Sequence, residues 1–172
     1  MHVFVTALLA LLPAFVAAQD KNDAVYRYRG ADRDARLLEK ARQEGTLTLY
    51  TSLAPTESGP LGQAFEKKTG VKVEIWRALS EKVVQRAVTE SRARRHTFDV
   101  VETNAPEMEM LAREKLFSVF HSPYLADLPA GAIPKHGQWV PDRDLARGDE
   151  LGEQHVALAH IGPELRELPK IR

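Results

Sequence analysis

The sequence predicts an α/β fold with an open, mostly parallel sheet and flanking helices. From Asp34 to Asn104 a strand pattern followed by a helix pattern occurs three times. Chains of this kind form parallel sheets, which bind ligands at the carboxyl ends of their strands. The sequence therefore predicts one rim of polar groups and helix N-termini, suited to a polar or anionic solute. The joints between strand and helix that form this rim are Thr51-Ser52, Ser80-Glu81 and Thr103-Asn104.

Composition excludes several classes of protein. A length of 172 residues favours one domain with a tail. Acidic and basic residues cancel at 24 each, so no overall positive charge attracts nucleic acid. The absence of cysteine excludes disulfides and cysteine-ligated metal sites. The chain has no G-x-S-x-G, G-x-G-x-x-G or G-x-x-x-x-G-K-[ST] motif. We therefore expect neither an enzyme nor a bound cofactor.

The first residues have the pattern of a secretory signal peptide. Val3–Val16 is almost wholly apolar, and Val16-Ala17-Ala18 places small residues at the −3 and −1 positions of a cleavage site. We expect cleavage to leave a mature chain that begins at Gln19, outside the cytoplasm. The segment before the apolar run contains His2 but no lysine or arginine, which leaves a membrane-anchored N-terminus as the alternative.

Glycine and proline mark the ends of the first predicted elements. Ala31–Glu44 is expected to be a helix, because its leucines and alanines recur at helical spacing and Gly45 suits a left-handed C-cap. Thr46–Tyr50 follows as the first strand. Ser58 is expected to cap the next helix, with Pro60 in the first turn, where a missing N–H costs nothing.

The second and third units repeat this plan. Val71–Trp76 alternates apolar and polar residues, which suits an edge strand with one face partly exposed. Ser80 is expected to cap a helix that continues to about Arg94. Phe98–Glu102 is the predicted third strand, and Pro106 starts another helix.

The C-terminal part has a different pattern. Ser122–Pro141 contains four prolines and is expected to be a loop, and Asp142–Arg172 is charged and shows no clear strand. Without further partner strands, we expect an exposed apolar sheet edge around Val100 and Val101. The predicted divisions of the chain are a signal peptide (1–18), an α/β unit (19–143) and a divergent tail that need not be ordered (144–172).

Five segments carry a family resemblance: Ala41–Leu53 (ARQEGTLTLYTSL), Phe65–Val83 (FEKKTGVKVEIWRALSEKV), Phe98–Leu111 (FDVVETNAPEMEML), Leu116–Pro129 and Gly137–Arg143. Through them the chain resembles the periplasmic solute-binding proteins of ABC importers, in the iron(III)/extracellular solute-binding branch. That family has two α/β lobes of the type II binding-protein fold, which close on a solute like a hinge. The resemblance implies a periplasmic monomer that captures a small-molecule or metal-ion solute and delivers it to an ABC permease. It also implies that this chain is C-terminally truncated and supplies the first lobe.

The resemblance assigns solute contacts to the residues of the predicted rim: Thr51, Ser52, Ser80, Glu81, Thr103 and Asn104. Glu81 stands where ferric-ion binders of the family have a glutamate ligand. The family's histidine position falls near Ala54, and the tyrosines of the second lobe have no counterpart, so Glu81 is the one candidate metal ligand. Ferric iron, a small organic anion and a phosphonate-like solute all stay open.

Residues of these types can also have a purely structural role, without contacting a ligand. Ser52 and Ser80 can satisfy backbone donors as helix caps, and Glu81 is favoured in a first helical turn by the helix dipole. Asn104 is an ordinary residue for a turn between strand and helix. The alternative to a solute-binding protein is a truncated, non-functional fragment that binds nothing tightly.

Overall fold

The computed structural model describes residues 27–95, 97–129, 131–141 and 156–160, the last of these by their backbone only. The predicted signal peptide and most of the predicted tail lie outside these residues. The described elements, in chain order, are α2 (Arg33–Glu44), β1 (Thr46–Thr51), α3 (Pro55–Thr69), β2 (Lys72–Arg77), α4 (Ser80–Arg92), β3 (Val100–Asn104), α5 (Ala105–Arg113), the 3-10 helix η1 (Pro123–Asp127), β4 (Val140–Pro141) and β5 (Val156–His160).

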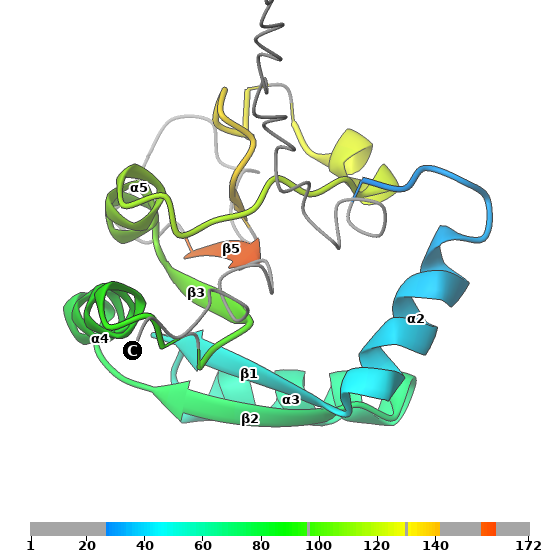
Figure 1. The fold of residues 1–172 in the computed structure, drawn as a ribbon, viewed down its shortest axis with the longest axis horizontal. Helices are drawn as coiled ribbons and strands as arrows, with labels where there is room; N and C mark the ends of the chain where they lie inside the picture. Colours follow the sequence, from blue (N-terminus) through cyan, green and yellow to red (C-terminus); the bar gives the residue numbers. More distant parts are fainter. Residues whose placement is uncertain (1–26, 96, 130, 142–155, 161–172) are drawn as a thin grey trace, which may run out of the picture.

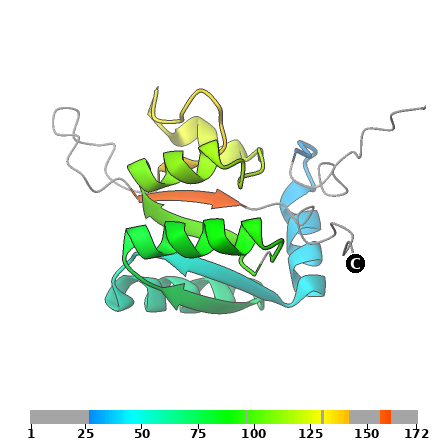
Figure 2. The same ribbon diagram turned by 60° about the vertical axis from the view of Figure 1, so that its left-hand side comes forward.

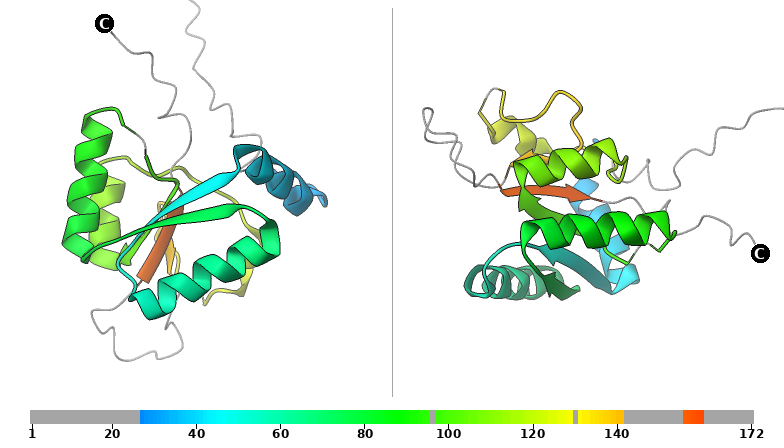
Figure 3. Two further views of the ribbon diagram at one scale, coloured as in Figure 1. Left: turned by 90° about the horizontal axis from the view of Figure 1, so that it is seen from below. Right: turned by 90° about the vertical axis from the view of Figure 1, so that its left-hand side faces the viewer.

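The strands form one five-stranded sheet in the order β2-β1-β3-β5-β4 (Figure 1). β1 pairs in parallel with both β2 and β3, which confirms the prediction of an open, mostly parallel sheet with flanking helices. The chain moves from β1 to β2 on one side and then to β3 on the other. Because crossovers between parallel strands are right-handed, this reversal places α3 and α4 on opposite faces. Figures 2 and 3 show α4 and α5 side by side over one face, α3 on the other, and α2 at the end where β1 begins.

One predicted helix end is confirmed and one predicted helix start is wrong. Gly45 follows α2 with a φ of 81°, a backbone conformation that favours glycine. α3 begins at Pro55, so Ser58 is not its cap: the Ser58 hydroxyl lies inside the helix and donates to the Ala54 carbonyl at 3.2 Å. Pro55 takes the first position, where a proline needs no N–H, and Pro60 lies one turn further in.

The main core lies between the sheet and the pair α4 and α5. Tyr50 and Val101 project from β1 and β3 into this layer, where Val83, Met108 and Leu111 come from the helices. All five side chains are buried, and the last four have no exposed surface. Burying a large apolar side chain stabilises a fold by about 1.5–3 kcal/mol, so this layer holds the helices at a fixed position over the strands.

The C-terminal part contributes a strand that the sequence did not indicate. β5 pairs antiparallel with β3 and with β4, and Val101 lies opposite Ala159. The expectation of an exposed edge at Val100 and Val101 is therefore wrong, as is the expectation of no strand after residue 142. The apolar run Val156–Ala159 has only four residues, which is too short for its periodicity to separate strand from other structure. Among the described helices, none is long and apolar enough to cross a membrane.

A buried polar cluster is part of the same layer. The Glu90 carboxylate accepts hydrogen bonds from the Tyr50 hydroxyl (2.9 Å), the Thr97 hydroxyl and Arg86 Nε (2.8 Å). The Arg86 guanidinium also lies over the rings of Tyr50 and Trp76, at 4.8 and 4.4 Å from their centroids. Burial acts to raise the pKa of Glu90, but the three hydrogen bonds outweigh burial and hold that pKa below its usual value.

Candidate functional site

The candidate site is the set of carboxyl ends of β1, β2 and β3, which we call the strand-end rim. β1 leads into α3 on one face of the sheet, whereas β3 leads into α5 on the other. Strand order reverses between these two neighbours, and open α/β sheets place their ligand sites at such a point. Of the predicted residues, Thr51 ends β1 and Ser52 follows it, whereas Thr103 and Asn104 end β3. Because β1 and β3 are neighbours, these two predicted pairs lie at adjacent strand ends.

A hydrogen bond joins the end of β3 to the start of α4. Asn104 Nδ2 donates to Ser80 Oγ at 2.9 Å. Both residues are half-buried, Ser80 as the first residue of α4 and Asn104 as the residue before α5. Ser80 is therefore not the predicted N-cap, because Leu79 takes that position and the Ser80 hydroxyl accepts from Asn104 instead. Two helix N-termini, which carry partial positive charge, meet beside this contact.

Thr103 directly precedes Asn104 in β3. Side chains alternate along a strand, so Thr103 lies on the same face as Val101, the face that α4 and α5 cover. Thr103 has no exposed surface, and its hydroxyl has no hydrogen-bond partner among the described residues. A buried hydroxyl without a partner is unfavourable by about 1–3 kcal/mol.

The loop between β1 and α3 is held by Glu102. Glu102 lies opposite Thr51 in the β1–β3 register and is almost completely buried, with 1% of its surface exposed. One of its carboxylate oxygens, Oε2, accepts hydrogen bonds from the Thr51 hydroxyl, the Ser52 N–H (3.0 Å) and the Leu53 N–H (3.2 Å). Arg77 Nε donates to the Leu53 carbonyl at 3.1 Å, so the end of β2 holds the same loop from its other side.

Thr51 and Ser52 are thus engaged within the chain. The Thr51 side chain is fully buried, whereas Ser52 stays half-buried at the rim. Sequence reasoning missed Glu102 as a residue of this site. Its signal was a carboxylate at the end of the predicted strand Phe98–Glu102, directly before the predicted rim, and a buried charge is rare unless it has partners.

Glu81 lies apart from the Ser80–Asn104 contact. It is exposed and lines a groove of about 550 Å³ between α4 and α5, together with Val84, Val88 and Met110. Within the described part of the chain, no three acidic or histidine side chains come together in a way that could hold a metal ion. Glu107 lines the same groove, and the role of Glu81 as a metal ligand stays a prediction.

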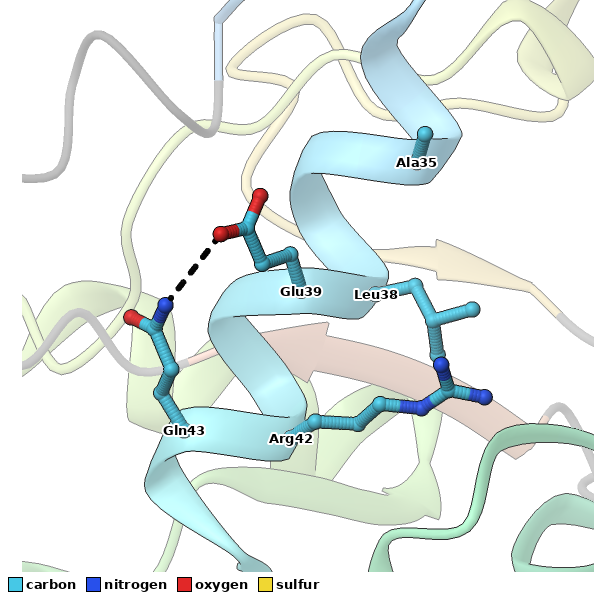
Figure 4. A pocket seen from close by; sticks show the side chains of 5 residues that line it. All are labelled: Ala35, Leu38, Glu39, Arg42 and Gln43. Atoms are coloured by element: carbon cyan, nitrogen blue, oxygen red, sulfur yellow. Dashed lines mark hydrogen bonds between the residues drawn. The ribbon is translucent and has the colours of Figure 1, made fainter.

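Two other polar arrangements lie away from the rim. A hollow of about 440 Å³ on α2 is lined by Ala35, Leu38, Glu39, Arg42 and Gln43, all from one helix (Figure 4). Figure 4 shows Gln43 pointing toward Glu39, to which it donates a hydrogen bond of 3.4 Å. Because β1 begins just after α2, this hollow lies near the amino end of β1, opposite to the rim.

Glu109 fastens the segment before β4 to α5. Its Oε1 lies 2.9 Å from His136 Nε2 and accepts from Trp139 Nε1 at 3.0 Å. His136 Nδ1 accepts from the Gln138 N–H, so Nε2 carries the proton that is donated to Glu109. The hydrogen bond from His136 is the main cause that lowers the pKa of the Glu109 carboxyl. The cluster positions the chain that enters β4.

No family model matches this chain, and no curated protein sequence matches it. Solved structures do match. The iron-bound HitA of Pseudomonas aeruginosa is 26% identical with a TM-score of 0.51, over 56% of this chain and 31% of HitA. The Trichodesmium protein IdiA (FutA), in complex with iron and citrate, is 24% identical with a TM-score of 0.51, over 56% of this chain and 31% of its own. The periplasmic binding protein AfuA of Actinobacillus pleuropneumoniae, with fructose-6-phosphate bound, is 17% identical with a TM-score of 0.52. The match covers 57% of this chain and 32% of AfuA.

These matches fix the fold and leave the solute open. Each covers a third or less of the matched protein, so this chain corresponds to one part of a longer architecture. The similar proteins are binding proteins, of which two hold iron and one a sugar phosphate. The α/β part of this chain therefore has the fold of one part of a type II periplasmic solute-binding protein, as its sequence segments predicted.

Proposed function

We propose that this chain is a substrate-binding component of an ABC importer, which captures a small polar or anionic solute at the strand-end rim. The observation that carries the proposal is the 2.9 Å contact between Asn104 Nδ2 and Ser80 Oγ. It brings two predicted ligand residues together where the N-termini of α4 and α5 meet. Helix N-termini favour anionic groups.

The similarity to HitA supports a binding role without a catalytic step, and the solute and the permease are part of the proposal. Ferric iron stays among the candidate solutes, together with small carboxylates, phosphonates and sugar phosphates. We also propose that the protein works in the periplasm after export. Mass spectrometry of the secreted protein is then expected to find a mature N-terminus at Gln19, and a mature form that keeps Met1 would contradict export by a cleaved signal.

Calorimetric titration of the purified full chain tests the binding role. Ferric citrate, phosphonates, small carboxylates and fructose 6-phosphate are titrated in turn. For a solute that binds, Asn104→Ala removes one hydrogen-bonding group, which at roughly 0.5–1.5 kcal/mol corresponds to a loss of affinity of up to about tenfold.

Thr89→Ala is the matched control, because Thr89 lies on the same helix as Ser80 but far from its start, and its hydroxyl donates to Gln85 within the helix. Equal losses in the two variants, or a full affinity in Asn104→Ala, would place the site elsewhere. Absence of heat with all four classes of solute would count against the proposed function itself.

A further inference from the structure

The donors of the loop between β1 and α3 are occupied by a group of the chain itself. Successive backbone N–H groups in a turn form a concavity that binds anions. Here the N–H groups of Ser52 and Leu53, with the hydroxyl of Thr51 beside them, converge on one oxygen of Glu102. Each N–H also has a second acceptor, the Glu102 carbonyl at 3.1 Å for Ser52 and Thr51 Oγ1 at 3.0 Å for Leu53. This is the arrangement of a bound anion, except that the anion is a side chain from the neighbouring strand.

The position of Glu102 accounts for its burial. An ionised carboxylate that leaves water without partners is strongly unfavourable, and hydrogen bonds to the charged form offset that penalty. With 1% of its surface exposed, the Glu102 carboxylate is stabilised by the three donors of the loop. The loop is fixed in return, since Arg77 holds its carbonyl side through the Leu53 oxygen.

We infer that Glu102 is an internal anion that fills, from within the chain, the position which the β1–α3 loop would otherwise offer to an anionic group of the solute. The inference rests on the proposed function, namely that the strand-end rim holds a solute. It makes Glu102 a positioning residue with an effect on selectivity. A solute then carries its negative charge at the starts of α4 and α5, beside Ser80, and presents a neutral or cationic part to the β1–α3 loop.

Phosphate titration followed by amide NMR on the ¹⁵N-labelled full chain tests the inference, with inorganic phosphate as the probe. In the native chain, the amide signals of Ser52 and Leu53 are expected not to respond to phosphate. Glu102→Ala removes both acceptor oxygens and the side chain that carries them, which vacates the position, and the same two amides are then expected to shift with phosphate. The gain in apparent affinity at these amides is expected to be about tenfold or more, the change that one hydrogen bond to a charged group corresponds to.

Two further variants keep the test decisive. Glu102→Ser also vacates the position, with a short polar side chain in place of the carboxylate, so it reports the same response if the alanine variant does not fold. Glu90→Gln removes a buried, hydrogen-bonded glutamate of the α4 layer, and its Ser52 and Leu53 amides are expected to stay unresponsive, as in the native chain.

The outcomes separate this inference from the proposed function. A phosphate response of Ser52 and Leu53 in the native chain overturns the inference, as does an absence of response in both Glu102 variants. The amides of Ser80 and Glu81 report independently on whether the negative charge of the solute lies at the start of α4, as proposed. If these amides ignore phosphate while the loop amides behave as expected, the internal anion stands and the placement of the solute's charge beside Ser80 falls.

Discussion

Replacing Glu90 with glutamine tests the buried cluster that fixes α4 to β1. The carboxylate accepts from two hydroxyls through one oxygen and from Arg86 Nε through the other. Arg86 has no acceptor, so the glutamine must turn its oxygen toward Arg86 and its NH₂ group toward Tyr50 and Thr97. The two hydroxyls then lose their charged acceptor.

The magnitude follows from the difference between charged and neutral hydrogen bonds. Bonds to a charged group contribute about 1.5–3 kcal/mol, against about 0.5–1.5 kcal/mol for neutral ones. The Arg86 side chain is 39% exposed, so solvent screens its ion pair with Glu90 and the lower part of the difference applies. We expect Glu90→Gln to lower the free energy of unfolding by about 1–2 kcal/mol at pH 7, a shift of roughly 1 M in the urea midpoint.

The effect depends on pH in a defined direction. The folded-state pKa of Glu90 lies below its ordinary value of 4.5. A carboxyl with a lowered folded pKa contributes stability that is present above the unfolded pKa and is lost as pH falls through the folded value. The gap between the native chain and Glu90→Gln is therefore expected to be constant from pH 7 down to about pH 5 and to narrow below pH 4.5.

Urea unfolding followed by tryptophan fluorescence measures this gap, because Trp76 lies 4.8 Å from the Tyr50 ring. Glu74→Gln is the control: Glu74 is paired with Lys72 on the exposed edge strand, and its loss is expected to change stability by less than about 0.5 kcal/mol. A gap between the native chain and Glu90→Gln that stays the same at pH 7 and pH 3.5 would refute a role for the Glu90 charge.

Two further predictions concern the core and the added strand. Leu111→Ala removes a side chain with no exposed surface and is expected to lower the free energy of unfolding in urea by about 2–5 kcal/mol. The control Leu79→Ala, at a side chain that is 67% exposed, is expected to change it by less than about 0.5 kcal/mol. Similar losses in both variants would contradict the described core. Hydrogen exchange is expected to be slow at the amides of Val156–His160 that bond within the sheet, and a whole segment that exchanges as fast as an unfolded peptide would remove β5 from the sheet.

The parallel part of the sheet could be predicted because local signals agreed with one another. Gly45 ends α2 where the apolar pattern stops, and the alternation in Val71–Trp76 indicated an edge strand, which β2 is. Boundaries shifted where two signals competed. Pro55 and Ser58 both suit a helix start, and the structure uses the proline, which needs no side-chain cap.

The candidate site was predicted in outline but not in its contacts. Topology alone places Thr51 and Asn104 at neighbouring strand ends, since carboxyl ends of parallel strands share one edge. The direction of each side chain could not be predicted, because it depends on register. In the observed register, Thr51 points inward to Glu102 and Asn104 contacts Ser80. Register depends on which strands are neighbours, and no local pattern of the sequence predicts that.

The position of β5 has a consequence for the order in which the molecule assembles. β5 lies between β3 and β4 in the sheet, although it comes after both in the chain. β4 pairs with β5 across a short separation, since Pro141 lies opposite Ala157, whereas β5 pairs with β3 across a long one, since Val100 lies opposite His160. A shorter loop closes at a smaller entropic cost, so β4 and β5 are expected to pair with each other before β5 joins β3. Refolding is therefore expected to end with one late step, in which β4 and β5 are added together to the edge of β3.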